Sequence, residues 1–154
     1  MYYQKLMFGL FKKKPKELPT FNFLQNYQNK EKYFIRTLQW DWLDDKMIHA
    51  FDNKSPRMIT MGEWPQQIFL DAVGQKTIEE YVIWMASQFS QGKVPDNFDE
   101  SMILTIEDLI ADGEMLRLVN EKTKLPYYLD EPKSKQDIDK AHALMVEDGY
   151  IKNK

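Results

Sequence analysis

Two helical patterns, each with its own start and stop signals, constrain the fold of this chain most. In the first, Thr77 and Glu80 fit a capping box, in which each side chain accepts a hydrogen bond from the other residue's backbone N–H. Apolar residues then follow at helical spacing until Gly92. The second pattern starts at Asp99, a residue type that favours the N-cap, and stops at Gly113. We therefore predict two consecutive helices separated by a short loop.

The N-terminal part favours β-structure. Between 21 and 43 the sequence is typical of strands, and Trp40 and Trp42 alternate with polar residues. Two interpretations remain open for 43–51. The favoured one is a helix with apolar residues on its inner face, and the other is a strand. A turn, "DNKSP", and a short strand, "RMITM", follow.

Two further helices are predicted, one after this strand-rich part and one at the end of the chain. The first is predicted to open at Trp64-Pro65, because proline is favoured in the first turn, and to end at Gly74. The last helix of the chain is predicted to begin with caps at Ser134 and Asp137.

A hairpin is expected between the second patterned helix and the last one. "MLRLV" and "LPYYL" predict its two strands, and Pro126, which has no N–H to donate, places the second strand at a sheet edge. Helices followed by a two-stranded wing are typical of a winged-helix domain. We therefore predict one α+β domain at 21–154, with a winged-helix-like core at about 57–129. A strand-rich portion precedes this core, an extra C-terminal helix follows it, and residues 1–20 form a basic leader.

Part of the core also resembles a narrower family. "VGQKTIEEYVIWMASQF" followed by "LTIEDLIADGEMLRL" looks like the PqqD-like peptide-binding domains, which serve as leader-peptide recognition elements in peptide maturation. The positions that carry the resemblance are Gly74, Thr77, Glu80, Leu109 and Gly113. The two quoted segments cover under half of the chain. The resemblance implies a winged-helix fold and a peptide-binding function.

Charge is distributed unevenly along the chain, whose net charge is −3. Residues 1–36 carry eight Lys or Arg against two Glu, a sum of +6, which leaves −9 for the remainder. An acidic body repels nucleic acid and gives no steering towards it. Double-helix recognition is therefore disfavoured, although a DNA-binding regulator acting as a dimer is the alternative function. The residues available to contact a phosphate backbone are Lys76, Lys93, Arg117, Lys122 and Lys124.

The helix between Asp99 and Gly113 has no basic residue, and an acidic surface of this kind suits a basic protein or peptide. We therefore expect a non-catalytic protein- or peptide-binding module, such as an adaptor, immunity-type or accessory factor. The predicted contact residues on this helix and the wing are Glu107, Asp108, Asp112, Arg117 and Tyr128. Trp40 and Trp42 fall on the same side of a strand and form a binding patch if that side is exposed.

Catalysis has little support in the sequence. The chain has no cysteine, no glycine-rich phosphate loop and no nucleophile elbow, so neither a cofactor nor a metal is predicted. The least favoured function is a hydrolase that uses His49 with Asp45, which share a face if the segment is helical.

The first residues show no export signal. "LMFGLF" is short for a signal peptide, and its charges follow the apolar run instead of preceding it. "MFGLFKKK" from Met7 resembles the start of many small bacterial proteins, and its apolar and basic residues suit weak contact with a membrane surface. We expect a cytoplasmic protein without a transmembrane segment.

Overall fold

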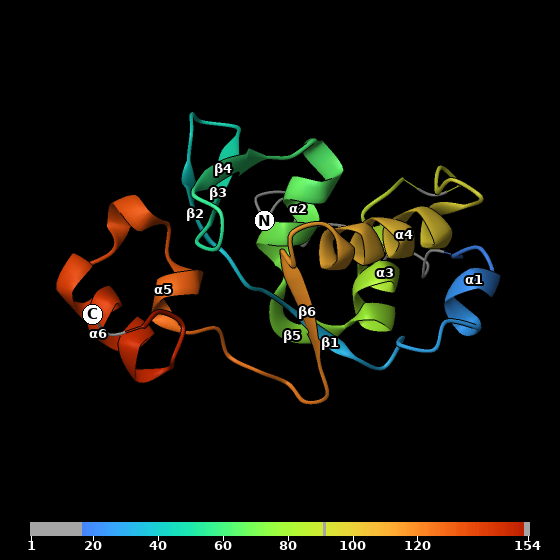
Figure 1. Cartoon of the computed structure of the whole chain (residues 1–154). Coiled ribbons are helices and arrows are strands. Elements are labelled where there is room, and N and C mark those ends of the chain that lie inside the picture. Colours follow the sequence, from blue (N-terminus) through green and yellow to red (C-terminus); the bar gives the residue numbers. More distant parts are fainter. Residues whose placement is uncertain (1–16, 91, 153–154) are drawn as a thin grey trace, which may run out of the picture.

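The structure is a computed structural model that describes residues 17–90 and 92–152 (Figure 1). It is an α+β fold with two antiparallel sheets of three strands each. In the first sheet β1 lies in the centre, and the strands in spatial order are β5 (Val73–Thr77), β1 (Tyr33–Arg36) and β6 (Leu116–Val119). The second sheet is a meander of β2 (Gln39–Trp42), β3 (Ile48–Asp52) and β4 (Arg57–Thr60).

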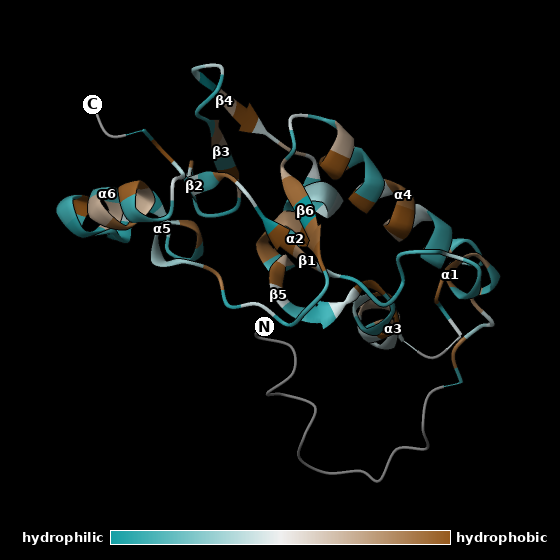
Figure 2. Ribbon diagram, turned by 60° about the horizontal axis from the view of Figure 1, so that its bottom comes forward, coloured by the Kyte–Doolittle hydropathy of each residue, from teal (hydrophilic) through white to brown (hydrophobic). Residues whose placement is uncertain are grey.

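Helices form the main core: three of them pack against the first sheet, and the first of the set packs against the last. These are α1 (Asn22–Gln25), α2 (Glu63–Asp71), α3 (Ile78–Ser87) and α4 (Phe98–Ala111). Phe34 of β1 is buried there, with its ring 5.2 Å from that of Tyr81 on α3. Figure 2 shows the hydrophobic residues of α2, β1 and β6 gathered at the middle of the molecule.

The C-terminal part of the chain builds a second, smaller core with the first sheet. It contains α5 (Tyr127–Asp130), the short 3₁₀ helix η1 (Lys133–Lys135) and α6 (Ile138–Glu147). Ile35 of β1 packs there with Leu125, Leu129 and Ala141. Because neighbouring residues of a strand point to opposite faces, Phe34 serves one core and Ile35 the other. The central strand therefore joins both halves of the molecule.

The two helices with the clearest sequence signals are confirmed. Thr77 caps α3 through the predicted box, with its hydroxyl accepting from the Glu80 N–H at 3.1 Å and its own N–H donating to Glu80 at 3.0 Å. The cap predicted at Asp99 is wrong. Helix α4 begins one residue earlier, and the buried Asp99 carboxylate accepts a hydrogen bond from the Leu24 N–H at 3.0 Å. It therefore fixes α1 instead of starting its own helix.

The segment 43–51 is a turn followed by a strand, so the favoured helical interpretation was wrong. Within β3, Ala50 is fully buried opposite Trp40, which shows that pairing with β2 decides the structure here. Residues 22–25 form a short helix, although strand was predicted there. The helix expected to end at Gly74 stops at Asp71, and Gly74 lies within β5.

The predicted wing does not form as a hairpin. Strand β6 is present, but its partner is β1, and "LPYYL" leads into the helical turn α5. This turn buries Leu125, Tyr128 and Leu129 together against the first sheet, which an extended strand with alternating faces would not do. Asp137 caps α6 as predicted, accepting from the Lys140 N–H at 2.9 Å.

The proposed cap Ser134 lies in η1 instead, where its N–H and hydroxyl both donate to Asp41 of β2. Predictions about the leader up to residue 16, including Met7, fall outside the described residues. In the part of the chain that the structure describes, no helix has the length and apolar character needed to cross a membrane.

Candidate functional site

A groove of about 1140 Å³ runs beside β6. One side is formed by β6 and the end of α4, and the others by the β3–β4 turn, α5 and residues 148–150. We call it the β6 groove. Figure 1 shows β6 standing between α4 and the C-terminal helices, so the groove lies where the two halves of the molecule meet.

One edge of β6 is unpaired in the described structure, because β6 is the last strand of its sheet and pairs with β1 alone. The Thr37 N–H donates to the Met115 carbonyl at 3.0 Å, and hydrogen-bonded pairs alternate along an antiparallel ladder. Arg117 therefore exchanges hydrogen bonds with Ile35. The backbone groups of Leu116 and Leu118 point away from β1, to the free edge.

Tyrosines form the opposite wall of the groove. The Tyr128 hydroxyl donates to Asp148 at 2.9 Å, and that of Tyr150 donates to the Thr37 carbonyl at 2.8 Å. Their ring centroids lie 5.0 Å apart. Burial, followed by the hydrogen bond to Asp148, raises the pKa of Tyr128. The wall is therefore apolar in its body, with its hydroxyl groups already bonded.

The raised tyrosine pKa values predict loss of stability in alkali. Burial and then the charge of Asp71 raise the pKa of Tyr81, whose hydroxyl donates to Asp71 at 2.8 Å. The unfolded tyrosine ionises near 10, whereas the folded one stays neutral. The free energy of unfolding should therefore fall above pH 10, by about 1.4 kcal/mol per pH unit for each such tyrosine. Urea denaturation at rising pH measures this slope, which Tyr81→Phe should reduce. A phenolate signal near pH 10 in the folded protein that disappears in Tyr81→Phe would contradict the assignment.

An exposed ion pair joins two residues that line the groove. Lys54, in the β3–β4 turn, binds Glu114 at 2.7 Å, so the second sheet is tied to the start of β6. Glu114 has a φ of 51°, in the left-handed region, and its carbonyl accepts a hydrogen bond from the Thr37 hydroxyl. The α4–β6 turn is thereby held against β1.

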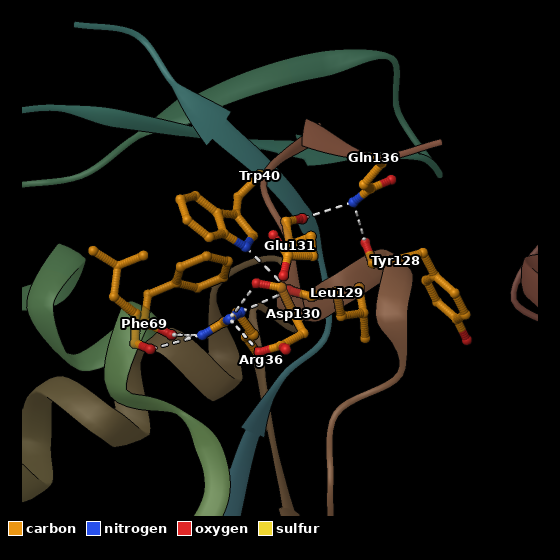
Figure 3. Close-up of polar contacts among 9 residues, drawn as sticks. Arg36, Trp40, Phe69, Tyr128, Leu129, Asp130, Glu131 and Gln136 are labelled. Carbon is orange, nitrogen blue, oxygen red and sulfur yellow. Dashed lines mark hydrogen bonds and ion pairs between the residues drawn. The ribbon is translucent and has the colours of Figure 1, made fainter. Parts of the chain in front are cut away.

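Arg36 positions α5, which carries Tyr128 and Leu129 on the lining of the groove. Its buried guanidinium donates to the carbonyls of Leu129 at 2.9 Å, Leu70 at 2.7 Å and Asp130 at 3.2 Å (Figure 3). The Trp40 indole N–H also donates to the Leu129 carbonyl, at 3.0 Å. Burial lowers the pKa of Arg36 to about 10, so it remains charged at neutral pH. These bonds join α2, β1 and α5.

The predicted contact residues do not form one surface. Arg117 and Tyr128 line the β6 groove, but Asp108 and Asp112 are exposed elsewhere on and beside α4. Glu107 is half-buried and accepts a hydrogen bond from the Tyr27 hydroxyl. The acidic residues Glu107, Asp108 and Asp112 therefore do not line the groove, although Ile110 at the end of α4 does.

The tryptophan pair is divided between the core and the surface. Trp40 is 6% exposed, whereas Trp42, near the end of β2, is 43% exposed. Their rings pack edge to face, with centroids 5.7 Å apart. A patch made of both rings is therefore not present, although Trp42 remains accessible.

The five predicted phosphate contacts are distributed over different elements. Lys76 is on β5, 4.9 Å from the Trp84 ring centroid, and Lys122 and Lys124 are in the segment after β6. Lys93 is in the loop before α4, and Arg117 faces the groove.

His49 and Asp45 do not share a helix face. His49 lies on β3, paired with Asp41 of β2, and its ring contacts that of Phe51, whereas Asp45 is exposed in the preceding turn. The described residues contain no group of three or more side chains that could hold a metal ion.

The sequence analysis does not identify three residues that line the groove, Thr37, Asp148 and Tyr150. Thr37 and Tyr150 are 113 positions apart and meet only because the C-terminal segment packs on the first sheet. Local periodicity carries no signal for such a contact. In comparisons with known proteins, the chain matches no family model, no curated protein and no solved structure.

Proposed function

We propose that this chain is a non-catalytic peptide-binding module that accepts an extended peptide as a further strand on β6. The unpaired edge of β6 inside the groove is the observation that carries the proposal. An exposed edge presents a row of backbone donors and acceptors, and strand addition is a common way to recognise an extended peptide. Backbone hydrogen bonds supply affinity, and side-chain pockets supply specificity.

The free edge of β6 has room for a short added strand. Leu116 and Leu118 offer two outward N–H and two outward C=O groups, spaced by two residues, or roughly 6.8 Å. Alternate side chains of an added strand would point towards Tyr128 on one side and towards Ile110 on the other, and both residues line the groove. The wall hydroxyls are bonded internally, so this wall offers a ligand the surface of its tyrosine rings and no free hydroxyl donor.

We also infer that α2, β5, α3, α4 and β6 are a variant of the winged-helix core, in which β1 takes the place of the second wing strand. The order helix, strand, helix, helix, strand supports this inference. The resemblance to peptide-binding PqqD-like domains agrees in function with the proposed strand addition. A chain without cysteine suits the reducing cytoplasm, where we expect the module to act.

Proline at Leu118 tests the proposal. Leu118→Pro removes an outward N–H while leaving the ladder with β1 in place, and proline is tolerated at such edge positions. Peptides selected by the wild-type protein from a displayed random-sequence library should bind this variant about tenfold more weakly, which corresponds to one or two lost hydrogen bonds. Titration calorimetry measures the affinities.

Leu118→Val is the matched control, because it shortens the half-buried side chain but keeps the N–H. It should retain binding to within about threefold, as expected when only a little packing is lost. Equal affinity of folded Leu118→Pro and wild type, or failure of the wild type to enrich any peptide, would refute strand addition. Retention of duplex DNA instead of peptides would favour the regulator interpretation.

A further inference from the structure

We propose that the peptide accepted by the β6 groove carries an acidic side chain that pairs with Arg117, and that apolar residues flank this acid. The inference rests on the proposed strand addition and adds the chemistry of the ligand. It differs from the sequence-based expectation of a basic partner, which depended on the acidic helix α4.

The carboxylates of the groove are already engaged. Three of them line it, and each has a partner within the protein. The partners are Arg57 for Asp52 at 3.3 Å, Lys54 for Glu114 at 2.7 Å and the Tyr128 hydroxyl for Asp148 at 2.9 Å. A basic ligand would therefore have to compete with these contacts.

Two cations of the groove, in contrast, lack such a partner. Arg117 and Lys124 both line it and are exposed, and neither forms a hydrogen bond or an ion pair with another described residue. Arg36 also lines the groove, but its guanidinium is buried against backbone carbonyls. Among the accessible lining residues without an ionic partner, these two cations therefore outnumber the single anion Asp148, and a carboxylate complements them.

The position of Arg117 within β6 gives the ligand a pattern. Its side chain points to the same face as Ile35, opposite in the ladder, and towards the tyrosine wall. An acid beside it in an added strand would accept the paired N–H groups of the guanidinium. The residues before and after that acid would point to the other face, where Leu118 and Ile110 lie. The expected motif is apolar, acidic, apolar.

Arg117 also argues against a second copy of this chain as the occupant. Two β6 strands paired antiparallel about a two-fold axis would bring their Arg117 side chains close together, and like charges on neighbouring strands repel. Charged residues on edge strands commonly prevent pairing between copies of one protein.

The test selects random-sequence displayed peptides on the full chain, as wild type and as Arg117→Glu. We expect wild-type selection to enrich Asp or Glu between two apolar residues. Replacing that acid by its amide in a selected peptide should weaken binding about tenfold, and Arg117→Glu should do the same. Replacing the acid by Lys should restore binding to Arg117→Glu.

Lys122→Glu is the matched control, because Lys122 is an exposed cation near the groove that does not line it. Its affinity for the selected peptides should change by less than about threefold, as expected for a screened charge. If Lys122→Glu weakens binding as much as Arg117→Glu, attraction is nonspecific and the pairing is refuted.

The selection separates this inference from the proposed function. Peptides that lack acid enrichment but lose affinity on Leu118→Pro would refute the acidic motif and leave strand addition intact. If the wild type enriches no peptide, both strand addition and the acidic motif are refuted. Both are also refuted if the selected peptides bind the double variant Leu118→Pro/Arg117→Glu as tightly as the wild type.

Discussion

Replacement of Gly74 by alanine is expected to destabilise the protein by about 3 kcal/mol or more. Gly74 has a φ of +76°, a conformation that costs an L-residue about 1–2 kcal/mol. A Cβ there would also collide with the Thr123 carbonyl oxygen and lie 2.9 Å from Ile35 Cγ2. The colliding oxygen belongs to the backbone, so the segment that connects β6 to α5 would have to move.

Gly149→Ala separates the two contributions. Gly149 has a similar φ of +72°, but a Cβ at this position has no neighbour within 4 Å. We therefore expect it to cost only about 1–2 kcal/mol. Chemical denaturation of both variants measures the difference. Equal destabilisation would show that the packing of Thr123 on β5 contributes nothing.

Arg36→Met is expected to cost about 3 kcal/mol or more and to release α5 from the first sheet. The substitution keeps an apolar stem of similar length but leaves the carbonyls of Leu70 and Asp130 without the guanidinium, while the Leu129 carbonyl keeps the Trp40 N–H. Each unsatisfied buried acceptor costs about 1–3 kcal/mol. Denaturation measures the total loss, and hydrogen exchange of the amides in 127–150 should accelerate more than that of α3.

Arg36→Lys is the matched variant, since it keeps the charge but cannot reach three elements with a planar group. We expect it to lie between wild type and Arg36→Met. Uniform acceleration of exchange over the whole chain in Arg36→Met would contradict a local role. Stability equal to wild type would mean that the carbonyls find other donors.

The sequence predicted those elements whose signals are local. The capping box at Thr77 defines α3, and the apolar spacing from Ile103 to Leu109 defines α4, because both depend on neighbours within a few residues. The segment 43–51 has spacing that suits a helix, but its structure is decided by Trp40, its partner across the sheet. Helical spacing and strand pairing compete in this segment, and contacts with residues outside it decide which structure forms.

The candidate site was predictable only in part. The sequence places Arg117 and Tyr128 in a predicted wing, and they line one groove although the wing itself does not form. The charge of Glu107 makes it a predicted contact residue, but its carboxylate already accepts a hydrogen bond from the Tyr27 hydroxyl, 80 positions away. A side chain's type can be read from the sequence, whereas the partner that satisfies it depends on long-range packing.

The central place of β1 determines when this protein can fold. Its partners are β5, which follows it by some forty residues, and β6, which follows by about twice as many. During synthesis β1 leaves the ribosome with both edges bare and remains so until α4 and β6 have been made. Closing such long loops slows folding and prolongs the exposure of an apolar strand. The strand that holds the two halves together is therefore also the one at greatest risk of aggregation before the chain is complete.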